Sequence, residues 1–207
     1  MLLFETHGRT RSRRYLRACP ETRVSLALLL LLLWGCSGPE PDTKSKDPYE
    51  RYLGLREILV ERNFSAEPDV VRLLDDPSYL VATGALEVMA GFGRKEYLPY
   101  ALPRLKAEHP MVRAQACETV AVVGGPEGRA PVMAVLRTDA DPAVRRAAIK
   151  VLAAHYGADP EVRKLLVETV ADKDPGVAYN AHERLSDLTG RKDIPRSRDA
   201  WAAVVSP

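Results

Sequence analysis

The sequence is 207 residues long, and 46% of its residues are hydrophobic while only 6% are aromatic. That length fits a single domain with a short appendage. The formal net charge is +2, but residues 1–35 hold six arginines against two glutamates, which leaves the remainder of the chain close to neutral. Because binding to a phosphate backbone depends on a surplus of basic side chains, we expect no nucleic acid among the partners.

A short apolar run follows the basic first segment. Residues 26–34 form this run, and arginines precede it. A helix needs roughly 20 apolar residues to cross a bilayer, so the run is too short for a membrane span. A basic region followed by a short apolar run is typical of a signal peptide, which we predict over residues 1–35.

The apolar run ends in Leu33-Trp34-Gly35-Cys36. This stretch resembles the lipobox of bacterial lipoproteins, in which the cysteine receives a diacylglyceryl group and becomes the first residue after cleavage. The resemblance implies lipidation of Cys36, a membrane anchor and a location in the cell envelope. Trp34 departs from the family pattern, because a much smaller residue usually stands there. The alternative is an ordinary leader with an incidental cysteine.

Residues 36–47 follow the lipobox and contain proline, glycine, serine and charged residues without apolar periodicity. This composition predicts a flexible tether between the anchor and a folded body.

The body carries a repeating mark in which proline follows an aspartate or a histidine. The prolines are separated by 29, 33, 32 and 33 residues. Aspartate is a good helix N-cap, and proline is tolerated at the first helical position, so each mark predicts the start of a helix. The five marks are Asp47-Pro48, Asp76-Pro77, His109-Pro110, Asp141-Pro142 and Asp174-Pro175.

Each predicted helix ends at a glycine or asparagine about 15 residues later, as a left-handed C-cap requires. These residues are Asn63, Gly93, Gly124, Gly157 and Gly190. Between start and end, small apolar residues recur at helical spacing, in the rows Val112, Ala116, Val120; Val144, Ala148, Leu152; and Val177, Ala181, Leu185.

A second helix is predicted before the next mark, most clearly over residues 129–137 and 160–171. One helical pair cannot bury its apolar face alone, so the units must stack. The sequence therefore predicts an all-α solenoid of about five two-helix units, filling residues 48–207 and starting near 48, 77, 110, 142 and 175.

The stretches "HPMVRAQACETVAVVGG" (109–125) and "DPAVRRAAIKVLAAHYG" (141–157) resemble HEAT repeats, especially their short bacterial form. In the last unit, "LSDLTG" followed by Trp201 resembles a closing unit of secreted HEAT-like proteins. The resemblance implies that Trp201 covers the open end of the stack.

No pattern in the body points to catalysis. The histidines lack the spacing of a metal site, no glycine-rich phosphate loop occurs, and no pair of acids stands out for acid–base work. Cys117 lies among alanines and valines and is predicted to be a buried hydrophobic residue. We therefore predict a protein that is not an enzyme and has neither cofactor nor metal.

Arg113 and Arg145 each lie three residues after the proline of their unit. They are predicted to form a ladder of ion pairs with acids of their own or a neighbouring unit. A charged stripe that binds a partner is the alternative.

The predicted function is a membrane-tethered scaffold that binds a protein or peptide on a concave face lined by the second helices. Two alternatives remain: a bilin-lyase-like protein that attaches a chromophore to a partner, as some relatives with this short repeat do, and a purely structural envelope protein. The candidate partner-binding residues are Arg104, Lys106, Arg129, Arg137, Arg163, Lys164 and Glu168.

Overall fold

Every regular element that the computed structural model describes, across residues 41–205, is a helix, and no strand occurs in this range. The predicted all-α class is therefore confirmed. The predicted signal peptide, Cys36 and the first part of the tether lie outside the described residues. Within them, no helix is both long enough and apolar enough to cross a bilayer.

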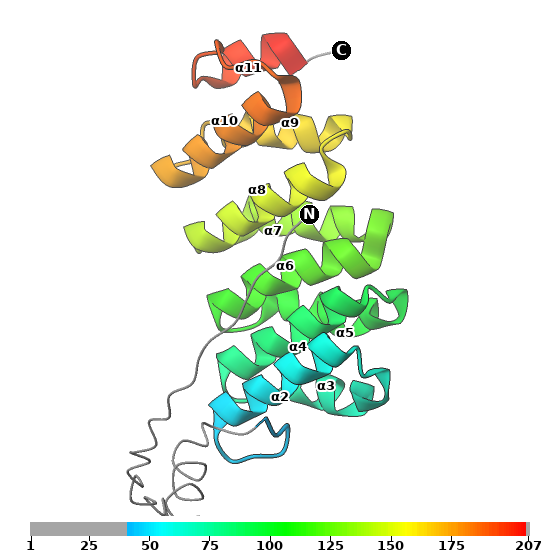
Figure 1. Ribbon diagram of the computed structural model, residues 1–207. Coiled ribbons are helices and arrows are strands. Elements are labelled where there is room, and N and C mark those ends of the chain that lie inside the picture. The colour runs from blue at the N-terminus through cyan, green and yellow to red at the C-terminus, as the bar shows by residue number, and fades with distance from the viewer. Residues whose placement is uncertain (1–40, 206–207) are drawn as a thin grey trace, which may run out of the picture. The chain divides into compact units, whose positions relative to one another are not determined.

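Within residues 41–205 the helices form a stack of two-helix repeats (Figure 1), of which this range contains five. Each repeat has a first helix, a turn and a second helical segment. The first helices are α2 (Pro48–Glu61), α4 (Tyr79–Phe92), α6 (Pro110–Gly124), α8 (Pro142–Tyr156) and α10 (Pro175–Thr189). The second segments are α3 (Glu67–Leu73), α5 (Leu98–Ala101) with the 3-10 helix η3 (Leu102–Lys106), α7 (Arg129–Thr138), α9 (Pro160–Thr169) and α11 (Arg198–Val205). Three further 3-10 helices lie between the first and second segments: η1 (Phe64–Ala66), η2 (Lys95–Tyr97) and η4 (Gly125–Gly128).

Four of the five predicted helix starts are confirmed. The carboxylate of Asp47 accepts a hydrogen bond from the N–H of Tyr49 at 2.8 Å, and Asp141 and Asp174 cap their helices in the same way. At the third start, Nδ1 of His109 accepts from the N–H of Met111 at 3.2 Å. These acceptors satisfy backbone donors that have no partner in the first helical turn.

The start predicted at Asp76-Pro77 is wrong. The helix α4 begins two residues later at Tyr79, and Ser78 occupies the N-cap position. Asp76 instead accepts a hydrogen bond from the N–H of Ser78 and forms an ion pair with Arg51. With this correction the first helices begin at 48, 79, 110, 142 and 175. The spacing between these starts is more even than the spacing between the prolines.

The predicted helix ends agree with the structure to within one residue, but the backbone conformation of the end residue differs from helix to helix. Gly93 and Gly190 have φ of 65° and 69°, as a left-handed C-cap requires. At the first helix the left-handed residue is Arg62, not Asn63. Gly157 has an ordinary φ of −60° and is needed for another reason: a Cβ there would lie 2.4 Å from Cδ2 of Leu188.

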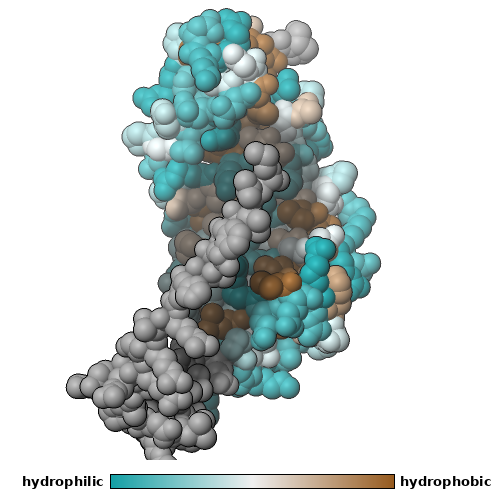
Figure 2. Space-filling view, in the orientation of Figure 1, coloured by the Kyte–Doolittle hydropathy of each residue, from teal (hydrophilic) through white to brown (hydrophobic). Residues whose placement is uncertain are grey.

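The predicted apolar rows are buried where the first helices pack against one another in series, from α2 to α10. In the corrected register the second repeat supplies the equivalent row Val81, Ala85 and Met89, which is also buried. Alanine at the centre of the rows lets neighbouring helices approach closely. The second segments pack against the row of first helices, and the buried side chains of both form one hydrophobic core along the stack. On the face shown in Figure 2, hydrophilic residues predominate and hydrophobic residues gather in separate patches.

The last repeat closes the stack as predicted. Trp201 on α11 is fully buried, and its indole N–H donates to Nδ1 of His182 on α10 at 2.9 Å. Burial of a large aromatic ring with its one polar group satisfied is a favourable way to cover an apolar end.

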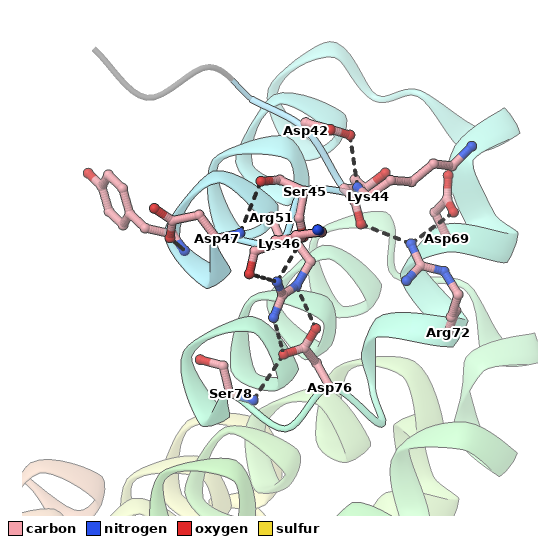
Figure 3. Close-up of polar contacts among 12 residues, drawn as sticks. Asp42, Lys44, Ser45, Lys46, Asp47, Arg51, Asp69, Arg72, Asp76 and Ser78 are labelled. Carbon is pink, nitrogen blue, oxygen red and sulfur yellow. Dashed lines mark hydrogen bonds and ion pairs between the residues drawn. The ribbon is translucent and has the colours of Figure 1, made fainter.

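Residues 41–47, which the sequence places in the tether, lie against the first repeat (Figure 3). Arg72 donates to the carbonyl of Thr43 at 2.9 Å, and Arg51 donates to the carbonyls of Ser45 and Lys46 at 2.9 Å. Later loops make the same contact, since Arg145 donates to the two carbonyls of residues 139 and 140. Residues 41–47 therefore take the place of an inter-repeat loop ahead of the first helix.

Candidate functional site

Three arginines in the described part of the chain connect successive loops, one of them buried and two half-buried, and each lies three residues after the start of its first helix. One nitrogen of each guanidinium donates to two carbonyls of the loop before its own helix. The remaining N–H groups of the guanidinium bind an aspartate in the loop that precedes the first helix of the following repeat. We call this arrangement an arginine staple, and Figure 3 shows the first of them. The pairs are Arg51–Asp76 at 2.7 Å, Arg113–Asp139 at 2.7 Å and Arg145–Asp172 at 2.8 Å.

The staples keep their carboxylates ionised in a partly buried setting. Burial raises the pKa of Asp139, but the hydrogen bonds from Arg113 and from the N–H of Asp141 outweigh it and lower that pKa. The pKa of Asp172 is lowered for the same reasons, with Arg145 as its partner. Arg145 is only 4% exposed. Removing one member of such a pair leaves an uncompensated charge, which is strongly destabilising.

The predicted ladder of Arg113 and Arg145 is thus confirmed, and these arginines are not free to form a charged stripe for a partner. The ladder is interrupted at one joint. Ala82 occupies the arginine position of the second repeat, and Ala107 occupies the aspartate position of the following loop. At the same joint, the ring of Tyr79 stacks on that of His109 with centroids 3.9 Å apart.

In the described part of the chain, the second segments leave three hollows along their side of the stack, each between the second segments of two successive repeats. The first helices are packed closely against one another, whereas neighbouring second helices touch less. The α5–α7 hollow has a volume of about 630 Å³, the α7–α9 hollow about 320 Å³ and the α9–α11 hollow about 440 Å³. These volumes fall in the range of ligand-binding pockets.

Two of the three hollows are mainly apolar. Leu102, Leu105 and Val135, together with three prolines, line the α5–α7 hollow. The α9–α11 hollow has Val167, Ala202 and Val205 in its lining. The α7–α9 hollow between them is more polar and is bordered by charged side chains from both helices.

Four of the seven candidate residues border these hollows. Lys106 lies at the α5–α7 hollow and Arg137 at the α7–α9 hollow. Lys164 and Glu168 of α9 lie between the α7–α9 and α9–α11 hollows and border both. All four are exposed, so a partner could reach them.

The other three candidates are engaged in contacts within the stack. Arg104 pairs with Asp75 at 2.7 Å, Arg129 pairs with Asp159, and Nε of Arg163 donates to the carbonyl of Gly157 at 2.7 Å. No observation here tests binding at any of the seven, so they stay predictions. For these three, however, the structure supplies a stabilising role that needs no partner.

The apolar lining of the hollows was not among the sequence candidates. Pro99 and Pro103 break the second segment of repeat two into α5 and η3, and Pro131 lies opposite them on α7. The proline-rich stretch "LPYALPRLK" (98–106) is the signal that could have marked this surface. Helix order alone predicted only charged residues on this side of the stack.

The described residues offer little for redox or metal chemistry. Cys117 is fully buried, and burial raises the pKa of its thiol to about 12, so the nucleophilic thiolate is scarce at neutral pH. Between residues 41 and 205, no group of three or more histidine, cysteine, aspartate or glutamate side chains is placed to hold a metal ion.

Comparison with known proteins gives a family and a fold. The sequence matches the family described as HEAT repeats over residues 67–139 and 129–202. Among curated proteins, none matches this sequence. The structure is similar to that of the complex of CpcE and CpcF of phycocyanin lyase from Nostoc sp. PCC7120, with a TM-score of 0.58 and 14% identity, over 82% of this chain and 71% of that chain. At this identity the likeness concerns the fold alone.

Proposed function

Since this chain belongs to the HEAT-repeat proteins, we propose that it is a non-enzymatic scaffold that binds a protein or peptide along its second helices. The observation that carries the proposal is the row of three hollows, two with mainly apolar linings and a more polar one between them, with exposed charged side chains at their borders. A concave, mainly apolar surface with a few polar groups is the usual form of a binding site, and stacked repeats present such surfaces over an extended length.

The scaffold is proposed to act in the cell envelope, held to a membrane by a lipid on Cys36. The support is the stretch Leu33-Trp34-Gly35-Cys36 after a short apolar run. Metabolic labelling with a palmitate analogue tests this part. Label on the wild type and none on Cys36→Ala is expected, and equal labelling of the two would contradict the anchor.

A chromophore-attaching function receives no support beyond the fold. The phycocyanin lyase complex shares 14% of its residues with this chain in the aligned part, which is too little to carry an activity across. A purely structural envelope protein is the remaining alternative, and it differs from a scaffold in having no preferred face for a partner.

Position-specific photo-crosslinking in intact cells separates these two. A photo-reactive residue at Lys164 on α9 is expected to give a discrete adduct. The same residue at Lys150 on α8, which is also exposed but lies on the first-helix side, is expected to give none. Adducts of the same pattern from both positions, or from neither, would count against a scaffold with a preferred face.

A further inference from the structure

We propose that the partner occupies the second helices with an extended, acidic segment, whose apolar side chains enter the α5–α7 and α9–α11 hollows. This inference rests on the proposed scaffold function and specifies the chemistry of its partner. Three features of the described residues lead to it: the order of the hollows, the absence of free backbone groups on a helical surface, and the charges at the borders.

The order of the hollows sets a spacing. Each lies between the second segments of two successive repeats, and the two apolar ones flank the polar one. Packed helices are about 10 Å apart, so the two apolar hollows are separated by two such steps, or about 20 Å. An occupant must therefore present two apolar groups at that distance, with a polar stretch between them.

The helical surface restricts the conformation of the occupant. The backbone groups of α7 and α9 are used inside these helices, so a partner strand cannot add to them as it would to a sheet edge. A polyproline II segment needs no such partners, because its backbone stays hydrated. At about 3.1 Å per residue, six residues of such a segment span about 19 Å, which matches the separation of the apolar hollows.

The border charges favour an acidic segment. Lys106, Arg137 and Lys164 form no ion pair with any residue between 41 and 205, and one of them lies at or beside each hollow. Of the two acids at the α7–α9 hollow, Glu161 is already paired with Arg129 at 3.4 Å, which leaves Glu168. The unpaired side chains at these borders are therefore mostly cationic.

The opposite side of the stack has a different charge pattern. A hollow there, between α4, α6 and α8, is bordered by Glu87 and Glu118 and by Lys150. Glu87 is paired with Arg56 at 3.7 Å, so the acid that an acidic segment would meet on that side is Glu118, beside one cation, Lys150, that is unpaired within residues 41–205. Among the described residues, the second-helix side presents three unpaired cations against Glu168. Complementary charge sets orientation and the rate of encounter more than the affinity itself.

Binding of labelled synthetic peptides to the full-length protein in detergent micelles, followed by fluorescence anisotropy, tests the proposal. The first peptide has two leucines about six residues apart, with prolines and glutamates between them. A second peptide of the same composition has its leucines about three residues apart. A third is a helix-forming peptide with leucines about thirteen residues apart, which gives a similar separation along a helix.

The first peptide is expected to bind best, and the expected loss with the second is about tenfold, since only one hollow can then be filled. Equal binding of the first two peptides, or stronger binding of the helical peptide, would overturn the extended occupant. If all three fail to bind while Lys164 still crosslinks to a partner in cells, this inference is wrong and the scaffold function stands.

Matched variants place the peptide on the surface. Lys164→Glu is expected to weaken binding of the first peptide about tenfold, whereas Lys150→Glu on the opposite side leaves it unchanged. Ala134→Glu puts a charged side chain into the α5–α7 hollow and should have a similar effect, with the exposed Ala143→Glu as its control. All four positions are solvent-accessible, and circular dichroism checks that the variants fold. Equal effects of a variant and its control would contradict the proposed location.

Discussion

At the scale of single residues, the aspartates of this chain have two roles that look alike in the sequence. Asp141 precedes a proline and caps a helix, while Asp76 also precedes a proline but binds Arg51. The cap depends on residues within the next turn, so a local pattern predicts it. The ion pair depends on a residue 25 positions away, and no local pattern contains that information.

The staples predict a large difference between two arginines. Arg145→Ala is expected to lower the free energy of unfolding by about 3–5 kcal/mol, because it leaves the partly buried Asp172 without its partner. Arg137→Ala removes an exposed arginine with no ion pair in the described part of the chain and should change stability by less than about 0.5 kcal/mol. Urea unfolding of both variants measures this, and similar losses in the two would mean that the staple adds nothing.

The lowered pKa of Asp172 predicts a pH dependence of stability. A carboxyl group whose pKa is lower in the folded state stabilises the fold above its unfolded pKa, about 3.9, and loses that contribution as the pH falls through the folded pKa. Stability of the wild type is therefore expected to fall below about pH 4. Asp172→Asn should be less stable at pH 7 and lose less on acidification, and parallel pH profiles for the two proteins would contradict this.

At the scale of elements, the interrupted ladder allows a direct test. Ala107 has nearly the same backbone conformation as Asp139, with φ and ψ of −58° and 150° against −67° and 132°. An aspartate there could therefore face an arginine introduced at Ala82. In a double-mutant cycle, Ala82→Arg and Ala107→Asp are expected to couple favourably by about 0.5–3 kcal/mol. A coupling energy near zero would show that this joint cannot hold a staple.

The first helices were predictable to within two residues, because caps, prolines and apolar rows are local signals with helical spacing. The second segments were less predictable from the sequence. Prolines divide one of them into α5 and η3, and the hollows arise only when neighbouring repeats are packed. Nothing in helix order could distinguish Arg104, which pairs with Asp75 from 29 positions earlier, from the exposed Lys106 two residues later.

At the scale of the whole molecule, each repeat contacts only its neighbours, so a destabilising substitution at one end should affect the stability of the nearby repeats alone. Trp201→Ala removes a fully buried ring from the last repeat and is expected to cost about 3–5 kcal/mol. Amide hydrogen exchange should accelerate in α10 and stay unchanged in α4. The exposed Tyr179→Ala on α10 serves as the control, and faster exchange along the entire stack would contradict a nearest-neighbour description.

The contact of residues 41–47 with the first repeat changes the reach of the proposed anchor. Only four residues, 37–40, separate Cys36 from this segment. Five peptide units span at most about 18 Å, so with Cys36 acylated the start of this segment, Pro41, stays within that distance of the residue that carries the lipid. A scaffold confined in this way searches for its partner by lateral diffusion in two dimensions, and a partner held in the same membrane meets it at a much higher effective concentration than a partner free in solution.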